Sequence, residues 1–125
     1  MSQPQNPEPF YSLARRAGDL LFLSGFGPVD AALNVVGDTI EAQTEFTMNA
    51  MQRVLESEGA TWDDVVRMNV YLLHMDDRDG FNRTYMGYFE GRRPPTRRVI
   101  GAGDLFKGIL VEIDCVAAPG TGSTA

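Results

Sequence analysis

The chain alternates strand-like and helix-like segments, but only two of its segments have the apolar periodicity of an α-helix. The run at residues 20–23, Leu-Leu-Phe-Leu, is continuously apolar, which indicates a strand covered on both faces. Two helices in a chain of 125 residues can cover only one face of a sheet. We therefore expect the second face to be buried against further copies of the chain, as in a homo-oligomer.

The order of the segments predicts an α+β fold, with two helices packed on one face of a mixed sheet. The first helix follows Asp38, which has capping-box spacing with Glu41, and runs to about residue 58. The second helix carries an aromatic stripe and is capped by Asp76 or Asp77. The helix-strand-helix stretch implies at least one parallel crossover. The predicted strands are residues 11–16, 20–25, 66–72, 97–102 and 109–116, with a further short strand at 33–36. In the strand at 66–72, the even-numbered residues are expected to face the core.

Length and an apolar content of 43% fit a single domain, residues 1–125, with an ordered core at about 10–118 and flexible termini. One cysteine, Cys115, excludes an intramolecular disulfide, and one histidine, His74, leaves too few ligands for a Cys/His zinc site. No metal site is predicted, although carboxylate sites stay open. The net charge of −6 disfavours a nucleic-acid partner. No run of about 18 apolar residues and no signal-peptide pattern occur, so we expect no membrane span and a reduced, cytoplasmic location.

Four arginines lie within seven residues, around two prolines: Arg92, Arg93, Arg97 and Arg98. Arginine binds carboxylates and phosphates with a bidentate fork, which lysine cannot do. Arg97 begins a strand directly after the prolines, so it is a candidate carboxylate clamp, with a plain surface charge as the alternative. Arg92 and Arg93 are interpreted as solvated charges near a helix end.

Glu112 and Asp114 share one face of a strand that otherwise looks buried, and buried carboxylates are uncommon unless they are paired or used. One interpretation is a general base or a water-positioning group, and the other is a salt bridge to the arginines. No serine elbow or cysteine partner accompanies His74, so a catalytic triad is not expected. Cys115 is interpreted as a packing residue rather than a nucleophile.

Other polar residues are weaker candidates for a binding pocket. Asn82 lies beside the inward stripe of the second helix, where its amide can bind substrate or pack the helix. Tyr11 precedes the first strand, and its plain interpretation is an edge aromatic. Ser24 and Gly25 end the second strand, where free backbone N–H groups can bind an anion or simply form a turn.

Several short motifs follow one another at near-constant spacing. They are Tyr11, Ala17-Gly18-Asp19-Leu20-Leu21-Phe22-Leu23-Ser24-Gly25, Gln43-Thr44, Glu58-Gly59-Ala60, Trp62-Asp63-Asp64-Val65-Val66, Met75-Asp76-Asp77, Phe81-Asn82-Arg83-Thr84-Tyr85, Arg93-Pro94-Pro95-Thr96-Arg97 and Leu110-Val111-Glu112-Ile113-Asp114. Taken in this order, they resemble the RidA/YjgF family of enamine/imine deaminases over residues 11–117.

The resemblance implies a chorismate-mutase-like domain that forms a homotrimer with clefts between its subunits. It also implies that Arg97 grips the substrate carboxylate and that Glu112 helps to activate the attacking water. The further residues that match the family's pocket are Tyr11, Asn82 and the backbone of Ser24 and Gly25. The implied reaction hydrolyses a 2-imino or 2-enamino acid to a 2-oxo acid and ammonia, without a cofactor.

Four residues that line or flank the implied cleft depart from the family pattern: Phe26 for Gln, Val99 for Cys, Phe106 for Pro, and Arg98 for Ser or Thr. These changes leave open a bulkier imine or a dicarboxylic one of the 2-aminomuconate kind. Arg98 is expected on the opposite face of the sheet from Arg97. Two other functions remain as alternatives. One is a non-catalytic trimer that binds a carboxylate ligand or has a regulatory role, and the other is an endoribonuclease, which the acidic charge and lone histidine disfavour.

Overall fold

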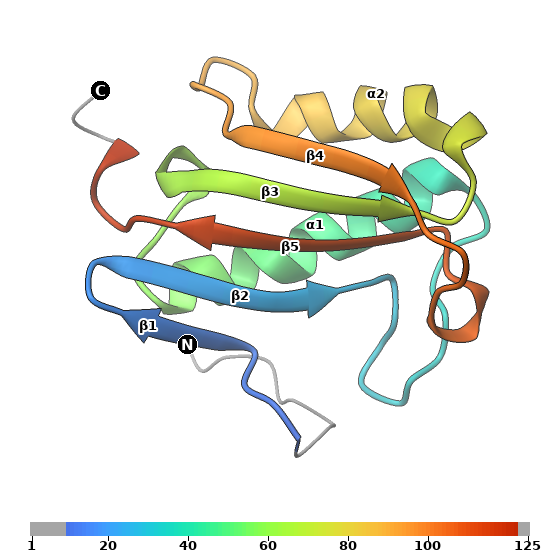
Figure 1. Cartoon of the computed structure of the whole chain (residues 1–125), viewed down its shortest axis with the longest axis horizontal. Coiled ribbons are helices and arrows are strands. Elements are labelled where there is room, and N and C mark those ends of the chain that lie inside the picture. The colour runs from blue at the N-terminus through green and yellow to red at the C-terminus, as the bar shows by residue number, and fades with distance from the viewer. Residues whose placement is uncertain (1–9, 123–125) are drawn as a thin grey trace.

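The computed structural model describes residues 10–122, which form one five-stranded sheet and two α-helices. The strands are β1 (Ala14–Ala17), β2 (Leu20–Phe26), β3 (Val65–Leu72), β4 (Thr96–Gly101) and β5 (Val111–Ala117). The α-helices are α1 (Ile40–Ser57) and α2 (Arg78–Tyr88), and single 3-10 turns span Trp62–Asp64, Met75–Asp77 and Phe106–Gly108. Figure 1 shows both α-helices behind the sheet, on the same face. The predicted α+β fold is confirmed.

The strands lie in the order β1-β2-β5-β3-β4. β3 and β4 are parallel and are connected through α2, whereas β1–β2, β2–β5 and β3–β5 pair antiparallel. A parallel pair cannot be joined by a tight turn, so the intervening helix provides the crossover. The predicted parallel crossover is confirmed, and β1 and β2 form an antiparallel hairpin.

The short strand predicted at 33–36 is wrong. Only an isolated bridge between Val29 and Val35 occurs there. The Oδ1 atom of Asp30 accepts the N–H groups of Ala32 and Asn34 at 3.0 and 2.9 Å, and this Asx turn bends the segment. Residues between β2 and α1 therefore form a folded-back loop rather than a strand.

A bulge in β3 changes which valine faces the core. The pairing of β3 with β5 shifts between Val65 and Arg67, so that Val66 falls outside the regular alternation. Val66 is 42% exposed, whereas Val65 is buried. The prediction that Val66 faces the core is therefore wrong, while Met68 and the later even-numbered residues of β3 are buried as predicted.

Thr39, rather than Asp38, caps the start of α1. The Thr39 Oγ1 atom accepts the N–H of Ala42 at 3.1 Å. Glu41 pairs with Arg83 at 3.2 Å and connects α1 to α2. The predicted N-cap is wrong by one residue, because Asp and Thr are both good N-cap residues and adjoin one another here. The predicted capping box does not form, because the third residue after Thr39 is Ala42.

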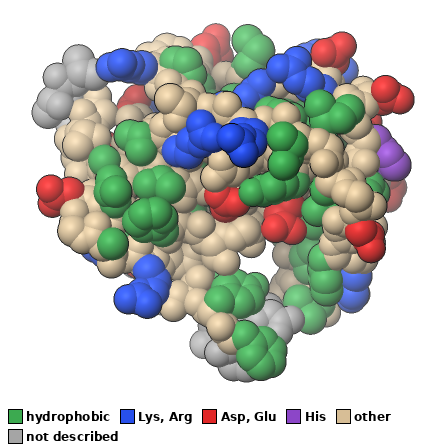
Figure 2. All heavy atoms as spheres, viewed as in Figure 1, with side chains coloured by type: hydrophobic (Ala, Val, Ile, Leu, Met, Phe, Trp, Pro, Cys, Tyr) green, Lys and Arg blue, Asp and Glu red, His purple; other side chains and the backbone are tan. Residues whose placement is uncertain are grey.

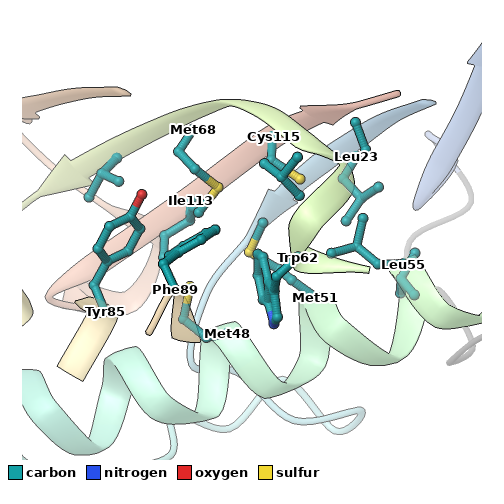
Figure 3. Packing of buried hydrophobic residues seen from close by; sticks show 14 of the residues in the cluster. Leu23, Met48, Met51, Leu55, Trp62, Met68, Tyr85, Phe89, Ile113 and Cys115 are labelled. Carbon is teal, nitrogen blue, oxygen red and sulfur yellow. The ribbon is translucent and has the colours of Figure 1, made fainter. Parts of the chain in front are cut away.

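The core lies between α1 and the inner face of the sheet (Figure 3). Met51 and Leu55 of α1 are fully buried beneath Ile113 and Cys115 of β5. Burial raises the pKa of Cys115 to about 12, and the charge of Asp114 acts in the same direction. The thiol therefore stays protonated, and its surroundings agree with a packing role.

The aromatic stripe of α2 closes the other end of the core. Phe81, Tyr85 and Phe89 are buried, as the helical spacing predicted. Trp62 packs edge-on against Tyr88 and Phe89, with ring centroids 5.8 and 5.5 Å apart. The aromatic side chains thus join α2 to the 3-10 turn that precedes β3.

The face of the sheet opposite the helices carries exposed apolar side chains, which Figure 2 shows among acidic and basic ones. They include Leu20, Phe22, Val66 and Ile100. In β2, Leu21 and Leu23 are buried, whereas Leu20 and Phe22 are exposed. Within one chain, therefore, the apolar run of β2 is covered on one face only.

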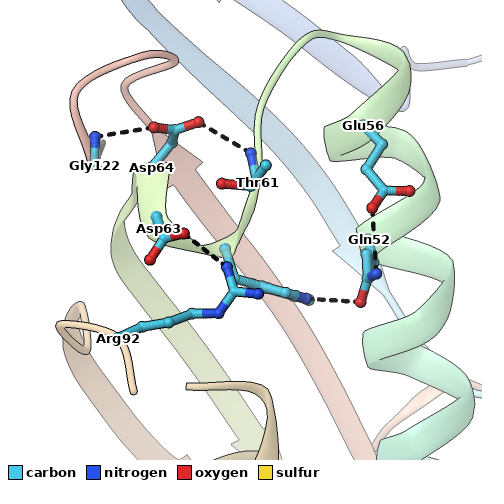
Figure 4. A network of polar contacts seen from close by, with 8 residues as sticks. Gln52, Glu56, Thr61, Asp63, Asp64, Arg92 and Gly122 are labelled. Carbon is cyan, nitrogen blue, oxygen red and sulfur yellow. Dashed lines mark hydrogen bonds and ion pairs between the residues drawn. The ribbon is translucent and has the colours of Figure 1, made fainter. Parts of the chain in front are cut away.

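Residues 118–122, which the sequence assigned to a flexible tail, fold against the Trp62–Asp64 turn. The Ala118 and Gly122 N–H groups donate to the backbone and side-chain oxygens of Asp64 at 2.8 and 3.0 Å (Figure 4). Asp64 also accepts the Thr61 N–H at 3.0 Å, which caps the start of the Trp62–Asp64 turn. The flexibility predicted for residues 1–9 and 123–125 lies outside the described residues. Within the described part, no helix is long and apolar enough to cross a bilayer.

Candidate active site

Arg97 lies on the helix-covered face of the sheet. On β4 it is in register with buried Met68 of β3, so its side chain points toward α2. Its Nη1 donates to Asn82 Oδ1 at 2.7 Å. Its guanidinium carbon lies 4.9 Å from the ring centroid of Tyr85 and 6.0 Å from that of Phe81. Two turns of α2 therefore hold one guanidinium.

Tyr85 adds a buried hydroxyl to this arrangement. That hydroxyl has no hydrogen-bond partner among the described residues. Burial raises the pKa of Tyr85 to about 12, although the nearby Arg97 cation opposes the rise. The phenol is thus neutral at physiological pH. Val99 lies two residues from Arg97 on the same face of β4 and packs against the core. We call Asn82, Tyr85, Arg97 and Val99 the Arg97 group.

Glu112 lies on the opposite face of the sheet. On β5 it is in register with Tyr71 of β3, between two buried residues of its own strand. Burial raises the pKa of Glu112, and the negative charge of Asp114 raises it further. A glutamate with a raised pKa can accept and return a proton nearer to neutral pH than an ordinary one.

A bulge in β2 makes room for the Glu112 carboxylate. Ser24 and Gly25 together occupy the step between the Leu23 and Phe26 pairings with β5. A Cβ atom on Gly25 would lie 2.7 Å from Glu112 Oε2, so a side chain at this position would displace the carboxylate from its present place. The Ser24 N–H donates to Leu13 O at 2.9 Å. The Ser24 N–H was expected to be free to bind a ligand, but it is already engaged by Leu13.

Glu112 borders a cavity of about 740 Å³, a volume typical of small-molecule sites. Its lining includes five of the predicted site residues: Tyr11, Ser24, Gly25, Phe26 and Glu112. The hollow opens beneath the central acidic side chains in Figure 2. We call this space the Glu112 cavity.

The family of the chain follows from comparison with known proteins. A sequence model described as endoribonuclease L-PSP matches residues 2–119. The crystal structure of YyfA, a Rid family protein from Yersinia pestis, superposes with a TM-score of 0.85 at 29% identity, over 89% of each chain. The chain belongs to the RidA/YjgF (Rid) family. A RutC family protein of Saccharolobus solfataricus is 40% identical over 114 residues, covering 89% of this chain and 90% of that one. A RutC family protein of Pyrococcus horikoshii is 34% identical, with the same coverage.

The predicted site residues of this Rid family chain fall into two separate places. Neither Arg97 nor its neighbours Asn82 and Val99 line the Glu112 cavity. Arg97 points to the helix side of the sheet and Glu112 to the open side, because their register partners Met68 and Tyr71 do so. One chain alone does not bring the two groups into a common site.

The other charged candidates lie outside the Arg97 group and do not line the Glu112 cavity. Asp114 accepts the amide of Asn69 at 2.8 Å on the open face, and no salt bridge joins it or Glu112 to an arginine among the described residues. Arg92 pairs with Asp63 at 2.9 Å and ties the segment after α2 to the Trp62–Asp64 turn (Figure 4). Arg92 is exposed and follows the end of α2, in agreement with its interpretation as a solvated charge near a helix end, and the ion pair with Asp63 is an addition to it. Arg98 is exposed and in register with Asn69, on the face opposite Arg97, as predicted.

His74 is exposed and precedes the Met75–Asp77 turn. Among the described residues, no cluster of three or more His, Cys, Asp or Glu side chains is arranged to hold a metal ion.

Sequence reasoning missed one wall of the Glu112 cavity. Phe46, Ala50 and Arg53 of α1 line it together. Their spacing of four and three residues was a detectable signal, because it defines a second helical face beside the buried stripe.

Proposed function

We propose that this protein hydrolyses 2-imino or 2-enamino acids to 2-oxo acids and ammonia, without a cofactor. In this proposal Arg97 binds the substrate carboxylate and Glu112 orients and activates the water. The observation that carries it is the Glu112 carboxylate, which has a raised pKa and lies against Gly25 at the wall of a ligand-sized cavity. Membership of the Rid family supports the same chemistry.

The active site we propose is shared between subunits of a homotrimer. Arg97 and Glu112 point to opposite faces of one sheet, so a neighbouring subunit must bring its Arg97 group toward the Glu112 cavity. The exposed apolar side chains of the open face, which include Phe22 and Val66, support association through that face. The reduced, cytoplasmic location inferred from the sequence stays a prediction.

The proposed mechanism needs positioning and proton transfer only. Arg97 fixes the carboxylate, so the C=N carbon is presented to a water molecule held by Glu112. Glu112 takes one proton from the water as the water oxygen bonds to that carbon, and it passes this proton to the imine nitrogen to give a carbinolamine. Glu112 then takes the proton of the carbinol hydroxyl and passes it to the amino nitrogen. As the C–N bond breaks, the C=O bond forms and ammonia leaves.

The direct test is hydrolysis of 2-iminobutanoate generated in situ, followed by the appearance of the 2-oxo acid. Arg97→Ala should abolish nearly all of the acceleration. Arg93→Ala is the matched control, because Arg93 is exposed, belongs to the same sequence cluster and lies outside both groups. Full activity in Arg97→Ala would refute the mechanism. Ligand-dependent stabilisation by 2-oxo acids without any turnover would favour the non-catalytic binding protein instead.

A further inference from the structure

Four phenylalanines from separate parts of the chain line the Glu112 cavity: Phe10, Phe26, Phe46 and Phe106. The whole chain contains seven phenylalanines, so this cavity takes more than half of them. None of the four belongs to the buried core, and only Phe26 packs against it. Aromatic side chains that are not needed for the core, but converge on one hollow, provide an apolar surface for a ligand.

Helix α1 supplies the fixed part of this surface. Phe46 and Ala50 project from the flank of the helix, whereas Met51, Val54 and Leu55 are buried in the core. The core residues anchor the helix, so Phe46 has a defined position. The cavity wall is thus attached to a rigid element.

Two loops also line the cavity, and a hydrogen bond joins them. Leu33 and Lys107 have φ angles of 66° and 52°, and are the non-glycine residues with positive φ in the described part of the chain. The Lys107 Nζ donates to Leu33 O at 2.6 Å, beside Phe106. Such backbone conformations are costly and tend to persist where the surrounding structure enforces them. The loop that carries Leu33 and the turn that carries Phe106 therefore form a preformed wall.

The charges around the cavity disfavour a second carboxylate on the ligand. Its charged lining residues are Asp30, Arg53 and Glu112. Asp30 is engaged in its own turn through two backbone N–H groups. Among the described lining residues Arg53 is the one cation, and it is exposed, against two carboxylates; Lys107 lies behind the lining, with its Nζ bound to Leu33 O. An additional anion would thus meet more negative than positive charge.

We infer that the Glu112 cavity receives the large apolar side chain of the substrate, aromatic or branched aliphatic, rather than a small or an acidic one. This inference rests on the proposed function for the reacting end of the substrate, whose C=N carbon lies at Glu112. The sequence left open a bulkier imine or a dicarboxylic one, and the inference selects the bulkier imine. Phe26 and Phe46 are then specificity-determining residues.

Binding of stable 2-oxo acids tests the inference without turnover. Phenylpyruvate, pyruvate and 2-oxoglutarate would be titrated into the full-length protein by calorimetry. We expect phenylpyruvate to bind at least about tenfold more tightly than the other two, since each apolar group in such a pocket is worth a factor of ten or more. Equal affinities, tighter binding of 2-oxoglutarate, or no measurable binding of phenylpyruvate would overturn the inference.

Single substitutions test whether the preference for phenylpyruvate arises in the Glu112 cavity. Phe46→Ala should weaken phenylpyruvate binding about tenfold and leave pyruvate binding unchanged. Phe26→Gln, in a different segment, should do the same and is independent of any defect in α1. Met86→Ala, which removes an exposed side chain outside the cavity, is the matched control. Equal weakening of all three ligands by both cavity variants would contradict the assignment.

Turnover separates this inference from the proposed function. If phenylpyruvate is preferred but no imine is hydrolysed, the proposed function fails and the selectivity of the cavity stands. If small and aromatic imines are hydrolysed equally well and the 2-oxo acids bind equally, the inference fails and the proposed function stands.

Discussion

Arg97 on β4 donates to Asn82 on α2 at 2.7 Å, and its guanidinium carbon lies 4.9 Å from the ring centroid of Tyr85 on the same helix. Asn82 and Tyr85 are three residues apart, so they project from neighbouring turns toward one cation. A guanidinium has five N–H donors, and Asn82 occupies one of them. Donors thus remain for the carboxylate that we propose as its ligand.

Replacing Asn82 should therefore impair substrate binding more than folding. Asn82→Ala removes the acceptor that orients Arg97, and we expect kcat/KM for imine hydrolysis to fall by about tenfold or more, mainly through KM. The free energy of unfolding should fall by about 1.5–3 kcal/mol, since one hydrogen bond to a charged group is lost. Steady-state kinetics and urea unfolding give the two numbers. Asn49→Ala removes an exposed acceptor of Tyr88 and is the control, and identical kinetics in both variants would contradict a positioning role.

The buried hydroxyl of Tyr85 gives a prediction on stability. Because this hydroxyl has no partner among the described residues, Tyr85→Phe should leave the free energy of unfolding unchanged or raise it by about 1 kcal/mol. The neighbouring Tyr88→Phe should instead lower it by about 1 kcal/mol, since the Tyr88 hydroxyl donates to Asn49 at 2.8 Å. Urea unfolding of the pair measures the difference. A clear loss of stability in Tyr85→Phe would mean that the hydroxyl is satisfied after all.

Glu112 should make folding stability depend on pH. Burial, and then the charge of Asp114, raise the pKa of Glu112 above its ordinary value of 4.5, so the folded chain binds this proton more tightly than the unfolded chain. Protonation of Glu112 therefore stabilises the folded chain fully below pH 4.5. This stabilisation is lost as the pH rises through the higher pKa that Glu112 has in the folded chain. Glu112→Gln should thus be more stable than the parent at neutral pH, with the difference disappearing in acid.

Urea unfolding at a fixed protein concentration across this pH range checks the prediction. Exposed Glu90→Gln is the matched control and should track the parent at every pH. A stability difference for Glu112→Gln that is constant with pH would show that its charge is not the cause.

The open face of the sheet should control assembly. Phe22→Asp places a charge among exposed apolar side chains that we propose to be buried between subunits, so it should dissociate the oligomer. Light scattering after gel filtration should give the mass of three chains for the parent and the mass of one chain, 13.8 kDa, for the variant. Met86→Asp, at an exposed site on α2, should not change the mass. A parent that is already monomeric would refute the shared site.

The apolar periodicity of the sequence predicted the helices and strands well, because it reflects which side of each element is buried. The alternation of Val111, Ile113 and Cys115 in β5, and the spacing of Phe81 and Tyr85 in α2, placed these residues on the buried side correctly. These patterns depend only on the geometry of one element.

Features that depend on pairing between elements were not visible in the sequence. Val66 leaves the core because of a shift against β5, and the bulge at Ser24 and Gly25 is a mismatch between two strands. The separation of Arg97 and Glu112 onto opposite faces likewise follows from the registers of three strands. Local patterns carry no information on such offsets.

The single cysteine has a practical consequence. Cys115 is buried in the middle of the sheet, and its pKa of about 12 leaves almost no thiolate while the chain is folded. An alkylating reagent can therefore reach the thiol only when the core opens. The rate of modification, followed as one mass increment per chain, would report the opening free energy in native buffer. All the variants above could then be ranked on one scale without denaturant.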